Sequence, residues 1–423
     1  MCRKALKQKE LPADSYYNTW PAVGASAAKK GSGVFLTAHA KRLPTPFSLR
    51  SKIRQVVTNV RDTVTAPRTD LAELERRALE ETLEARGHQP FRAHQIFQWI
   101  YRHGVTDVPA MTDLPRALRA QLAAEFVLTT PELAHRDRSI DGTEKFLLRL
   151  ADGQRIESVF IPDTPSMTFC ISTQVGCAMA CAFCLTGKMG LIRNLTAGEI
   201  VGQVRVLAEA LTMREARFNI VLMGMGEPLH NYDETMKALR ILADEHGLAM
   251  SPRRITLSTV GLLPALERLA REPIMPNLAI SLHAPTDAMR GELVPINRKY
   301  GVSDIIEACK RFPLKRRNRI TFEYVLLAGV NDSPADARRL AKLLAGVKSK
   351  VNLIPLNAAA GIPFERPSDE TVDRFAGILA DHHLIVSVRK SRGRDIRAAC
   401  GQLIVEGPRK SPAQQLATLA FGN

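Results

Sequence analysis

Three cysteines with a spacing typical of metal ligands lie together near the middle of the chain. In the segment CISTQVGCAMACAFC, Cys177, Cys181 and Cys184 form a C-x3-C-x2-C pattern, and Cys170 stands seven residues upstream. Soft thiolates suit an iron–sulfur cluster or zinc. A structural zinc site would need Cys170 or a distant residue as its fourth ligand. A cubane cluster held by three cysteines leaves one iron without a protein ligand, free to chelate the amino and carboxylate groups of a substrate.

The cysteine pattern follows the first of six strand-like runs that alternate with helical stretches. Each run is continuously apolar, as is typical of parallel strands covered on both faces. The runs lie at 168–173, 218–226, 254–261, 277–284, 319–331 and 350–357. Six βα units are too few to close an eight-stranded barrel. The sequence therefore predicts an α/β partial barrel with its site at the carboxyl ends of the strands.

Polar residues stand at the carboxyl ends of four more of these runs. They are Gly226 and Glu227 at the end of the second run, Ser258 in the third, Ser281 and His283 in the fourth, and Asn357 at the end of the sixth. Each one alone is as typical of a turn or a cap as of a functional group. Because they occupy corresponding places in successive units, together they predict one shared site.

The chain before the barrel divides into two further regions. Apolar alternation on both sides of Asp152-Gly153 predicts a β-hairpin, with Glu157 on its second strand. Helical periodicity upstream predicts a small helical accessory domain, and its basic surface favours RNA binding. Its apolar stripe is expected in the core rather than in base stacking; the stripe consists of Phe91, Ile96, Phe97, Ile100 and Tyr101.

These patterns divide the chain into five segments. They are a basic leader at 1–70, the helical domain at 71–130, a linker and hairpin at 131–165, the barrel with a carboxyl-terminal cysteine segment at 166–405, and a tail at 406–423.

The net charge of +16 lies mostly in the leader, where residues 1–69 hold thirteen basic and three acidic side chains. Such charge favours a polyanionic partner such as nucleic acid. The leader lacks periodicity and is rich in Pro, Ser, Thr and Gly, so we expect it to be disordered. The chain shows neither a membrane-length apolar run nor a secretory signal, and seven cysteines do not suit a fully paired disulfide framework. We therefore expect a cytosolic protein with no membrane partner.

Taken together, the motifs resemble the RlmN family of RNA methyltransferases within the radical S-adenosylmethionine (SAM) superfamily. The resemblance covers about residues 71–405, through STQVGCAMACAFC, MGMGEPL, TLSTVG, AISLHA, NLIPLN and DIRAACGQL. It implies a partial (β/α)6 radical SAM barrel, a [4Fe-4S] cluster and two SAM molecules per turnover. It also implies a monomer that acts on 23S rRNA and tRNA with a flavodoxin-like or ferredoxin-like electron donor and a thiol reductant.

The resemblance assigns a role to each candidate residue. Cys177, Cys181 and Cys184 would hold the cluster. Cys400 would carry the methyl group, Cys170 would release the product through a transient disulfide, and Glu157 would accept a proton. The SAM contacts would be Gly226, Glu227, Ser258, Ser281, Leu282, His283 and Asn357.

The reaction that this resemblance implies is methylation of adenine C2 in the peptidyl-transferase centre of 23S rRNA and 3′ to the anticodon in tRNA. A Cfr-type enzyme, which methylates adenine C8, is the nearest alternative. A radical SAM enzyme for a small molecule or a protein, and a non-catalytic zinc or iron–sulfur RNA-binding protein, are two others. Cys170, Cys400 and the basic segment before Cys400 disfavour the first of these two, and the strand-end residues disfavour the second. The basic segment, expected to hold phosphates near the reacting base, contains Arg389, Lys390, Arg392, Arg394 and Arg397.

Overall fold

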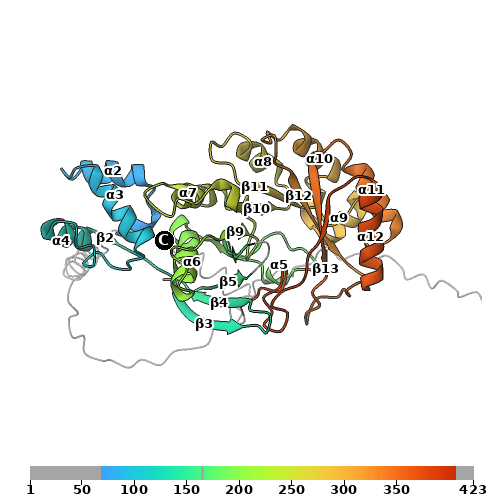
Figure 1. Cartoon of the computed structure of the whole chain (residues 1–423), viewed down its shortest axis with the longest axis horizontal. Coiled ribbons are helices and arrows are strands. Elements are labelled where there is room, and N and C mark those ends of the chain that lie inside the picture. The colour runs from blue at the N-terminus through green and yellow to red at the C-terminus, as the bar shows by residue number, and fades with distance from the viewer. Residues whose placement is uncertain (1–67, 163–165, 406–423) are drawn as a thin grey trace, which may run out of the picture. The chain divides into compact units, whose positions relative to one another are not determined.

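A computed structural model describes residues 68–162 and 166–405 of the chain (Figure 1). The predicted tail, almost all of the predicted leader and three residues of the predicted linker lie outside the described residues. Within the described ranges, no helix is long and apolar enough to cross a membrane.

The amino-terminal part of the described chain is helical, as its periodicity predicts. Four of the five residues of the apolar stripe are buried. The expectation is wrong for Phe91, which is 49% exposed and lies beneath the guanidinium of Arg92. The elements are β1 (Thr69–Asp70), η1 (Leu71–Glu73), α2 (Arg76–Glu84), α3 (Phe91–Phe97), η2 (Gln98–Arg102), α4 (Arg116–Glu125) and β2 (Phe126–Val127).

This helical part contacts the first two long helices of the barrel, α6 (Ala197–Ala210) and α7 (Tyr232–Ala243). Arg76 Nε donates to Asp244 Oδ2 at 2.9 Å, directly after α7. Arg205 of α6 donates to the carbonyl oxygen of Val105 at 2.8 Å. Charge-assisted hydrogen bonds of this kind hold the accessory helices in a defined position on the barrel.

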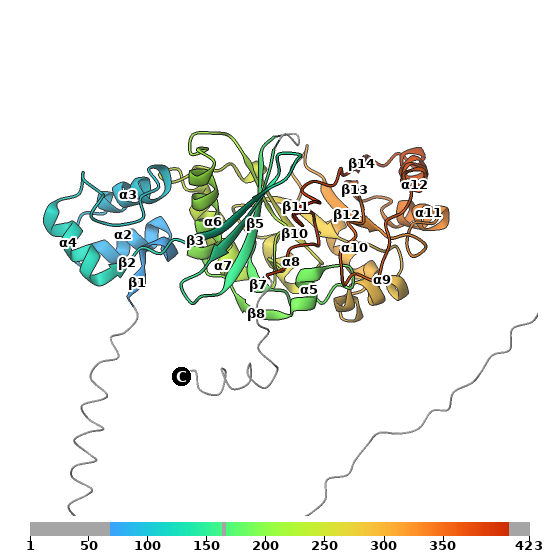
Figure 2. The same cartoon turned by 90° about the horizontal axis from the view of Figure 1, so that it is seen from below.

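Six parallel strands form the barrel and correspond to the six apolar runs. They belong to one ten-stranded sheet of order β14-β13-β12-β11-β10-β9-β6-β5-β4-β3. Figure 2 shows β3 and β5 on one side of β10 and β11, and β12 to β14 on the other. The predicted α/β partial barrel is thus confirmed. The six strands are β6 (Thr168–Cys170), β9 (Asn219–Leu222), β10 (Ile255–Thr259), β11 (Asn277–Ser281), β12 (Ile320–Leu326) and β13 (Ser349–Pro355).

The two edges of the sheet extend beyond the six units. At one edge, β14 (Val386–Val388) pairs in parallel with β13. At the other, β5 (Arg155–Ile161) pairs antiparallel with β6 and with β4 (Glu144–Arg149), which confirms the predicted hairpin. A third antiparallel strand, β3 (Glu132–Arg138), pairs with β4 and is almost wholly exposed. The hairpin is therefore continuous with the first strand of the barrel.

Helices cover the outside of the barrel strands (Figure 1). The first, α6, begins with a capping box in which Thr196 and Glu199 each accept a backbone hydrogen bond of the first turn. The others, besides α7, lie between successive strands of the sheet, two of them between β11 and β12. They are α8 (Leu263–Leu269), α9 (Asp287–Leu293), α10 (Val302–Arg311), α11 (Pro334–Leu343) and α12 (Asp369–Asp381), with short turns η3 (Pro252–Arg254) and η4 (Pro295–Arg298).

Candidate active site

The three cysteines of the pattern lie on a loop whose ends are joined by a small antiparallel ribbon. The ribbon pairs β7 (Gln174–Gly176) with β8 (Leu191–Asn194), and α5 (Leu185–Met189) lies within the loop. Burial raises the pKa of Cys177 to about 12, and it also raises the pKa of Cys181 and that of Cys184. These thiols therefore need a cationic partner, such as a metal, to be thiolates at neutral pH.

One pocket at the carboxyl ends of the parallel strands collects most of the predicted site residues. Cys170, Glu157 and Leu282 do not line it, and Leu282 is fully buried in the core. The predicted residues that line the pocket are Cys177, Cys181, Cys184, Gly226, Glu227, Ser258, Ser281, His283, Asn357 and Cys400.

The loop after β9 lies tightly against the cysteine ribbon. Gly226 has a φ of +106°, and a Cβ there would lie 2.7 Å from the Cβ of Gln174, so the position requires glycine. Gln174 Oε1 accepts the backbone N–H of Glu227 at 2.9 Å, and Gln174 Nε2 donates to Asn194 Oδ1 at 2.8 Å. Gln174 therefore joins both strands of the ribbon to the loop that carries Glu227.

The carboxylate of Glu227 is buried at the wall of the pocket. It accepts the backbone N–H of Leu229 at 3.0 Å and that of Val260 at 2.9 Å. Burial nevertheless raises its pKa to about 7. A cationic group in the pocket would favour the ionised form, so this side chain suits the recognition of an ammonium group.

Two serine hydroxyls bridge the next strands on the same face of the sheet. Ser258 Oγ of β10 lies 3.2 Å from Ser281 Oγ of β11. His283 follows with a φ of +62° and a buried ring, whose Nδ1 accepts the backbone N–H of Val325 at 3.1 Å. Burial, assisted by the charge of Arg290, lowers the pKa of His283 to about 3, so its imidazole is neutral.

The loops after β10 and β11 are organised by one fully buried cation, Arg290 of α9. Its guanidinium donates to the carbonyl oxygens of Leu282 at 3.0 Å, Val260 at 2.7 Å and Ser281 at 3.1 Å, and to Asn297 Oδ1 at 3.0 Å. These bonds fix the backbone that presents Ser281 and His283 to the pocket.

Cys400 lies on a segment that follows β14 and contains neither helix nor strand. The backbone N–H of Leu185, in helix α5 of the cysteine loop, donates to the carbonyl oxygen of Gly401 at 2.8 Å. Thr186 Oγ1 donates to the carbonyl oxygen of Leu403 at 2.6 Å. The cysteine loop and the Cys400 segment therefore hold each other in place.

The same segment is also attached to the β3–β4 turn. Ser139 Oγ donates to Asp395 Oδ1 at 2.6 Å, and the backbone N–H of Gly393 donates to Asp141 Oδ2 at 2.9 Å. Gly393 has a φ of +61°, and a Cβ there would lie 2.9 Å from Cγ2 of Thr143, so no larger residue fits. Cys400 is thus positioned from both the barrel and the hairpin.

The two remaining cysteines of interest, Cys170 and Cys400, lie close to each other and to one cation. Burial, and then the proximity of Cys400, raises the pKa of Cys170 to about 12, while Arg389 opposes this shift. Cys400, together with Glu323 and Cys170, raises the pKa of Arg389. Both thiols are free in this structure. Arg389 therefore supplies the positive charge that a thiolate at either position would need.

Cys170 and Glu157 occupy the same face of the sheet. Cys170 pairs in register with Val159, which is two residues from Glu157 on β5. Glu157 Oε2 accepts the backbone N–H of Ile404 at 2.9 Å, in the segment that carries Cys400. Neither side chain lines the pocket, but both lie beside the segment that does.

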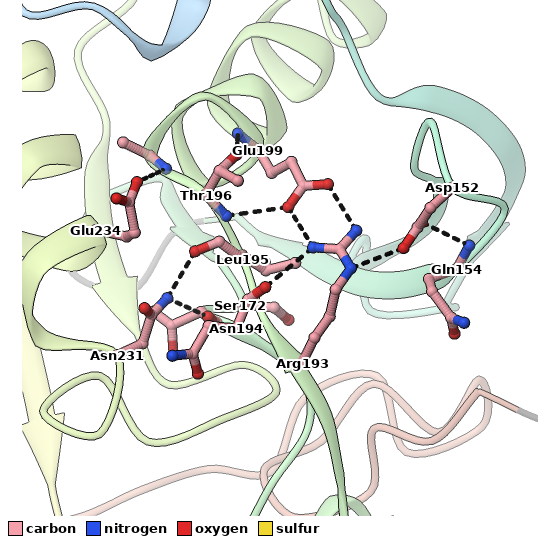
Figure 3. A network of polar contacts seen from close by, with 12 residues as sticks. Asp152, Gln154, Ser172, Arg193, Asn194, Leu195, Thr196, Glu199, Asn231 and Glu234 are labelled. Atoms are coloured by element: carbon pink, nitrogen blue, oxygen red, sulfur yellow. Dashed lines mark hydrogen bonds and ion pairs between the residues drawn. The ribbon is translucent and has the colours of Figure 1, made fainter. Parts of the chain in front are cut away.

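Arg193 ties the cysteine ribbon to its surroundings, as Figure 3 shows. Its Nε donates to Asp152 Oδ2 in the hairpin turn at 2.7 Å, and its Nη1 and Nη2 donate to the two carboxylate oxygens of Glu199 at 2.7 and 2.8 Å. Close by, Asn231 Nδ2 donates to the carbonyl oxygen of Leu195 at 2.7 Å, at the end of the ribbon. The base of the cysteine loop is thus held by the hairpin and by the start of α6.

Comparisons with known proteins agree with this geometry. The radical SAM superfamily matches residues 171–341, and the ribosomal RNA large subunit methyltransferase N-terminal domain matches residues 69–128. The dual-specificity RNA methyltransferase RlmN of Anaeromyxobacter sp. (strain Fw109-5) is 50% identical over 81% of this chain and 92% of its own length. The RlmN of Rhodospirillum rubrum is 48% identical over 84% of both chains.

The chain belongs to the RlmN family.

A solved radical SAM methyltransferase from Sphaerobacter thermophilus superimposes on this RlmN-family chain with a TM-score of 0.76. It is 50% identical and covers 80% of this chain and 100% of its own. The predicted membership of the RlmN family is therefore confirmed, and with it the class of radical SAM RNA methyltransferases.

Membership of the radical SAM superfamily implies SAM and a [4Fe-4S] cluster, and the pocket fits both groups. Two buried thiols, Cys177 and Cys181, and the half-buried thiol of Cys184 line it together with Glu227 and the two serine hydroxyls. In the described part of the chain, no three Cys, His, Asp or Glu side chains are grouped closely enough to hold a single metal ion. The thiolates that bind a [4Fe-4S] cubane lie further apart than the ligands of a single metal ion, because each thiolate binds a different iron.

Sequence reasoning missed one charged residue of the pocket and assigned only part of the role of another. Glu323 lines the pocket from the middle of β12, where its charge interrupts a buried apolar strand, and that interruption was the available signal. Arg389 was expected to hold phosphates, but it also lines the pocket beside the two thiols. Arg389 directly follows β14, which has only three residues and no buried position, so the sequence carried no pattern that could indicate this.

Proposed function

We propose that this chain methylates C2 of adenine in 23S rRNA, at the peptidyl-transferase centre, and in tRNA, 3′ to the anticodon. The observation that carries the proposal is the pair of free thiols, Cys170 and Cys400, beside Arg389 at the edge of a pocket lined by three further cysteines. Adenine C2 has no lone pair with which to attack a methyl donor, so an ordinary displacement fails there. A thiol that first carries the carbon unit removes this obstacle.

When bound, SAM and the cluster supply the methyl group and the 5′-deoxyadenosyl radical, two SAM molecules being used per turnover. Cys177, Cys181 and Cys184 would hold the cluster, and Glu227 with Ser258 and Ser281 would orient SAM; Gly226, Leu282, His283 and Asn357 would complete its site. The sulfur of Cys400 carries the carbon to the base, so enzyme and RNA become covalently joined through it.

Release of the product needs a base and a second thiol. Once the adduct has given up the unpaired electron left by addition to C2, Glu157 takes the proton from C2, and the electrons of that C–H bond restore the aromatic ring. The Cys170 thiolate then attacks the sulfur of Cys400. The bond between that sulfur and the transferred carbon breaks with its electron pair on the carbon, which takes up one proton to complete the methyl group; this leaves methyladenine and a transient Cys170–Cys400 disulfide. A thiol reductant then restores both thiols, and a flavodoxin-like or ferredoxin-like donor supplies the electron for SAM cleavage.

Mass spectrometry of RNA tests this proposal. Digested rRNA and tRNA from a strain that lacks its own adenine-C2 methyltransferase should gain 2-methyladenosine when this chain is expressed. The Cys400→Ala variant should leave the RNA unmodified. Formation of 8-methyladenosine instead would favour the Cfr-type alternative, and the absence of any methyladenosine would overturn the proposal.

A further inference from the structure

Each carboxylate oxygen of Glu157 has its own partner. Oε2 accepts the backbone N–H of Ile404 at 2.9 Å, and Oε1 lies 3.1 Å from the ammonium nitrogen of Lys145. The side chain of Glu157 is 5% exposed, and that of Lys145 is 13% exposed. The structure therefore holds a nearly buried ion pair beside the segment that carries Cys400.

The register of the hairpin explains why these two side chains meet. Lys145 on β4 lies opposite Val159, and Glu157 lies opposite Leu147, so Lys145 and Glu157 are diagonal neighbours on one face of the sheet. Asp137 of β3 lies opposite Lys145, with 3.9 Å between Asp137 Oδ2 and the ammonium nitrogen. One ammonium group therefore lies between a buried carboxylate and a more exposed one.

Within the described residues, charged and hydrogen-bonding groups reach Glu157 from three elements. Lys145 lies on β4 and Asp137 on β3, and the carboxyl-terminal segment contributes the Ile404 N–H. Beyond them, His135 Nε2 lies 2.9 Å from Asp137 Oδ1 and is exposed. Burial raises the pKa of Glu157, Lys145 and Ile404 oppose this shift, and Asp137 adds to it weakly.

We propose that Lys145 is a positioning residue for the proton transfer, and that it holds the Glu157 carboxylate ionised and aimed at the reacting base. This inference rests on the proposed function, in which Glu157 accepts the C2 proton. A buried carboxylate without its cationic partner tends to stay protonated, and a protonated Glu157 cannot act as a base. The ammonium of Lys145 restores the carboxylate, while the Ile404 N–H fixes which oxygen points away from the base.

The test compares Lys145→Met and Lys145→Arg in the holoenzyme under anaerobic conditions with RNA. Three quantities are followed from pH 6 to pH 9: 5′-deoxyadenosine, the covalent enzyme–RNA adduct and released methyladenosine. Lys145→Met should form 5′-deoxyadenosine and adduct as the wild type does, but release methyladenosine more slowly at pH 7, by about tenfold for each unit by which the pKa of Glu157 rises beyond 7. Release should recover at higher pH, and Lys145→Arg should restore most of it at pH 7.

The matched control is Lys310→Met, an exposed lysine on α10 that pairs with Glu307. An unchanged pH profile in Lys145→Met would overturn the inference. Equal loss of 5′-deoxyadenosine, adduct and product in both Lys145 variants would also overturn it, because that result indicates a structural role. If the wild-type chain makes no 2-methyladenosine at all, the proposed function fails instead, and the two failures are thereby distinguished.

Discussion

Glu227 accepts the backbone N–H of Val260 at 2.9 Å, so one buried carboxylate joins the loops that follow β9 and β10. Burial raises its pKa from 4.5 to about 7. Between these values the unfolded chain has lost the proton and the folded chain retains it, so this group lowers stability as pH rises through that window. In cluster-free protein, the free energy of unfolding of the wild type should fall by about 2 kcal/mol more than that of Glu227→Gln between pH 5 and pH 7.5. Urea unfolding at the two pH values measures the difference. An equal change in the free energy of unfolding in the wild type and Glu227→Gln would contradict the raised pKa.

Substitution of a cysteine in the C-x3-C-x2-C pattern should remove the cluster, whereas substitution of a buried cysteine elsewhere should not. Cys177→Ala, Cys181→Ala and Cys184→Ala should each lose cluster iron and reductive SAM cleavage, because each removes one iron ligand. Cys309→Ala is the control, since Cys309 is buried on α10 outside the pocket. Iron and sulfide analysis after anaerobic reconstitution, with a SAM cleavage assay, provides the measurement. Full activity in any of the three pattern variants would remove the basis for the cluster assignment.

Variants that lack Cys170 or Cys400 should stop the reaction at different stages. Cys400→Ala should form no covalent adduct, because no sulfur carries the carbon. Cys170→Ala should accumulate RNA bound through Cys400, because the cluster loop, the pocket and Cys400 remain and only the releasing thiol is absent. Protein purified from RNA-replete cells should then show excess mass that nuclease reduces. An adduct-free Cys170→Ala protein with an intact cluster would exclude the releasing role.

Substitution of Arg290 should lower the free energy of unfolding strongly. Arg290→Met removes the donor to three carbonyl oxygens, two of them in buried hydrogen bonds, and to the side-chain oxygen of Asn297. The expected loss is about 3–5 kcal/mol in the free energy of unfolding. Exposed Arg338→Met, on α11, should stay within about 0.5 kcal/mol of the wild type. A comparable small loss in both variants would show that the loops are held by other contacts.

Arg193 should control how firmly the cluster loop is held. Arg193→Ala removes the bonds to Asp152 and Glu199 at the base of the loop. We expect iron release to a chelator to be several-fold faster and the free energy of unfolding to fall by about 1–2 kcal/mol. Arg149→Ala, which breaks an exposed ion pair with Glu132 in the same hairpin, serves as the control. Equal release rates in wild type and Arg193→Ala would argue against this role.

The fold was readable from the sequence where burial left a strong pattern. The six barrel strands are continuously apolar because helices cover them, and the hairpin carries its Asp152-Gly153 turn signal. The sequence did not predict β3, because six of its seven residues are exposed. It did not predict β14 either, because that strand has only three residues. Neither strand buries enough apolar surface to leave a periodic pattern.

The candidate site was readable where chemistry restricts residue type and spacing, as with the three cysteines and the strand-end residues. The partners that tune those residues come from distant parts of the chain. Arg389 meets Cys170 only because β14 pairs beside β13, and Lys145 meets Glu157 only through the register of β4 and β5. Such contacts depend on strand pairing, which local sequence does not specify.

The pairing of β7 with β8 brings the two ends of the cysteine loop together, and the backbone N–H of Cys177 donates to the carbonyl oxygen of Gly190 at 2.9 Å. The chain therefore leaves the barrel and returns to it at one place, the β7–β8 ribbon. Because a closed loop adds little to the entropy of the connection, an insertion between those ends leaves β6 and α6 in place as long as Leu185 and Thr186 keep their bonds to the Cys400 segment. The length of the cysteine loop can therefore vary between these fixed points while the barrel keeps its shape.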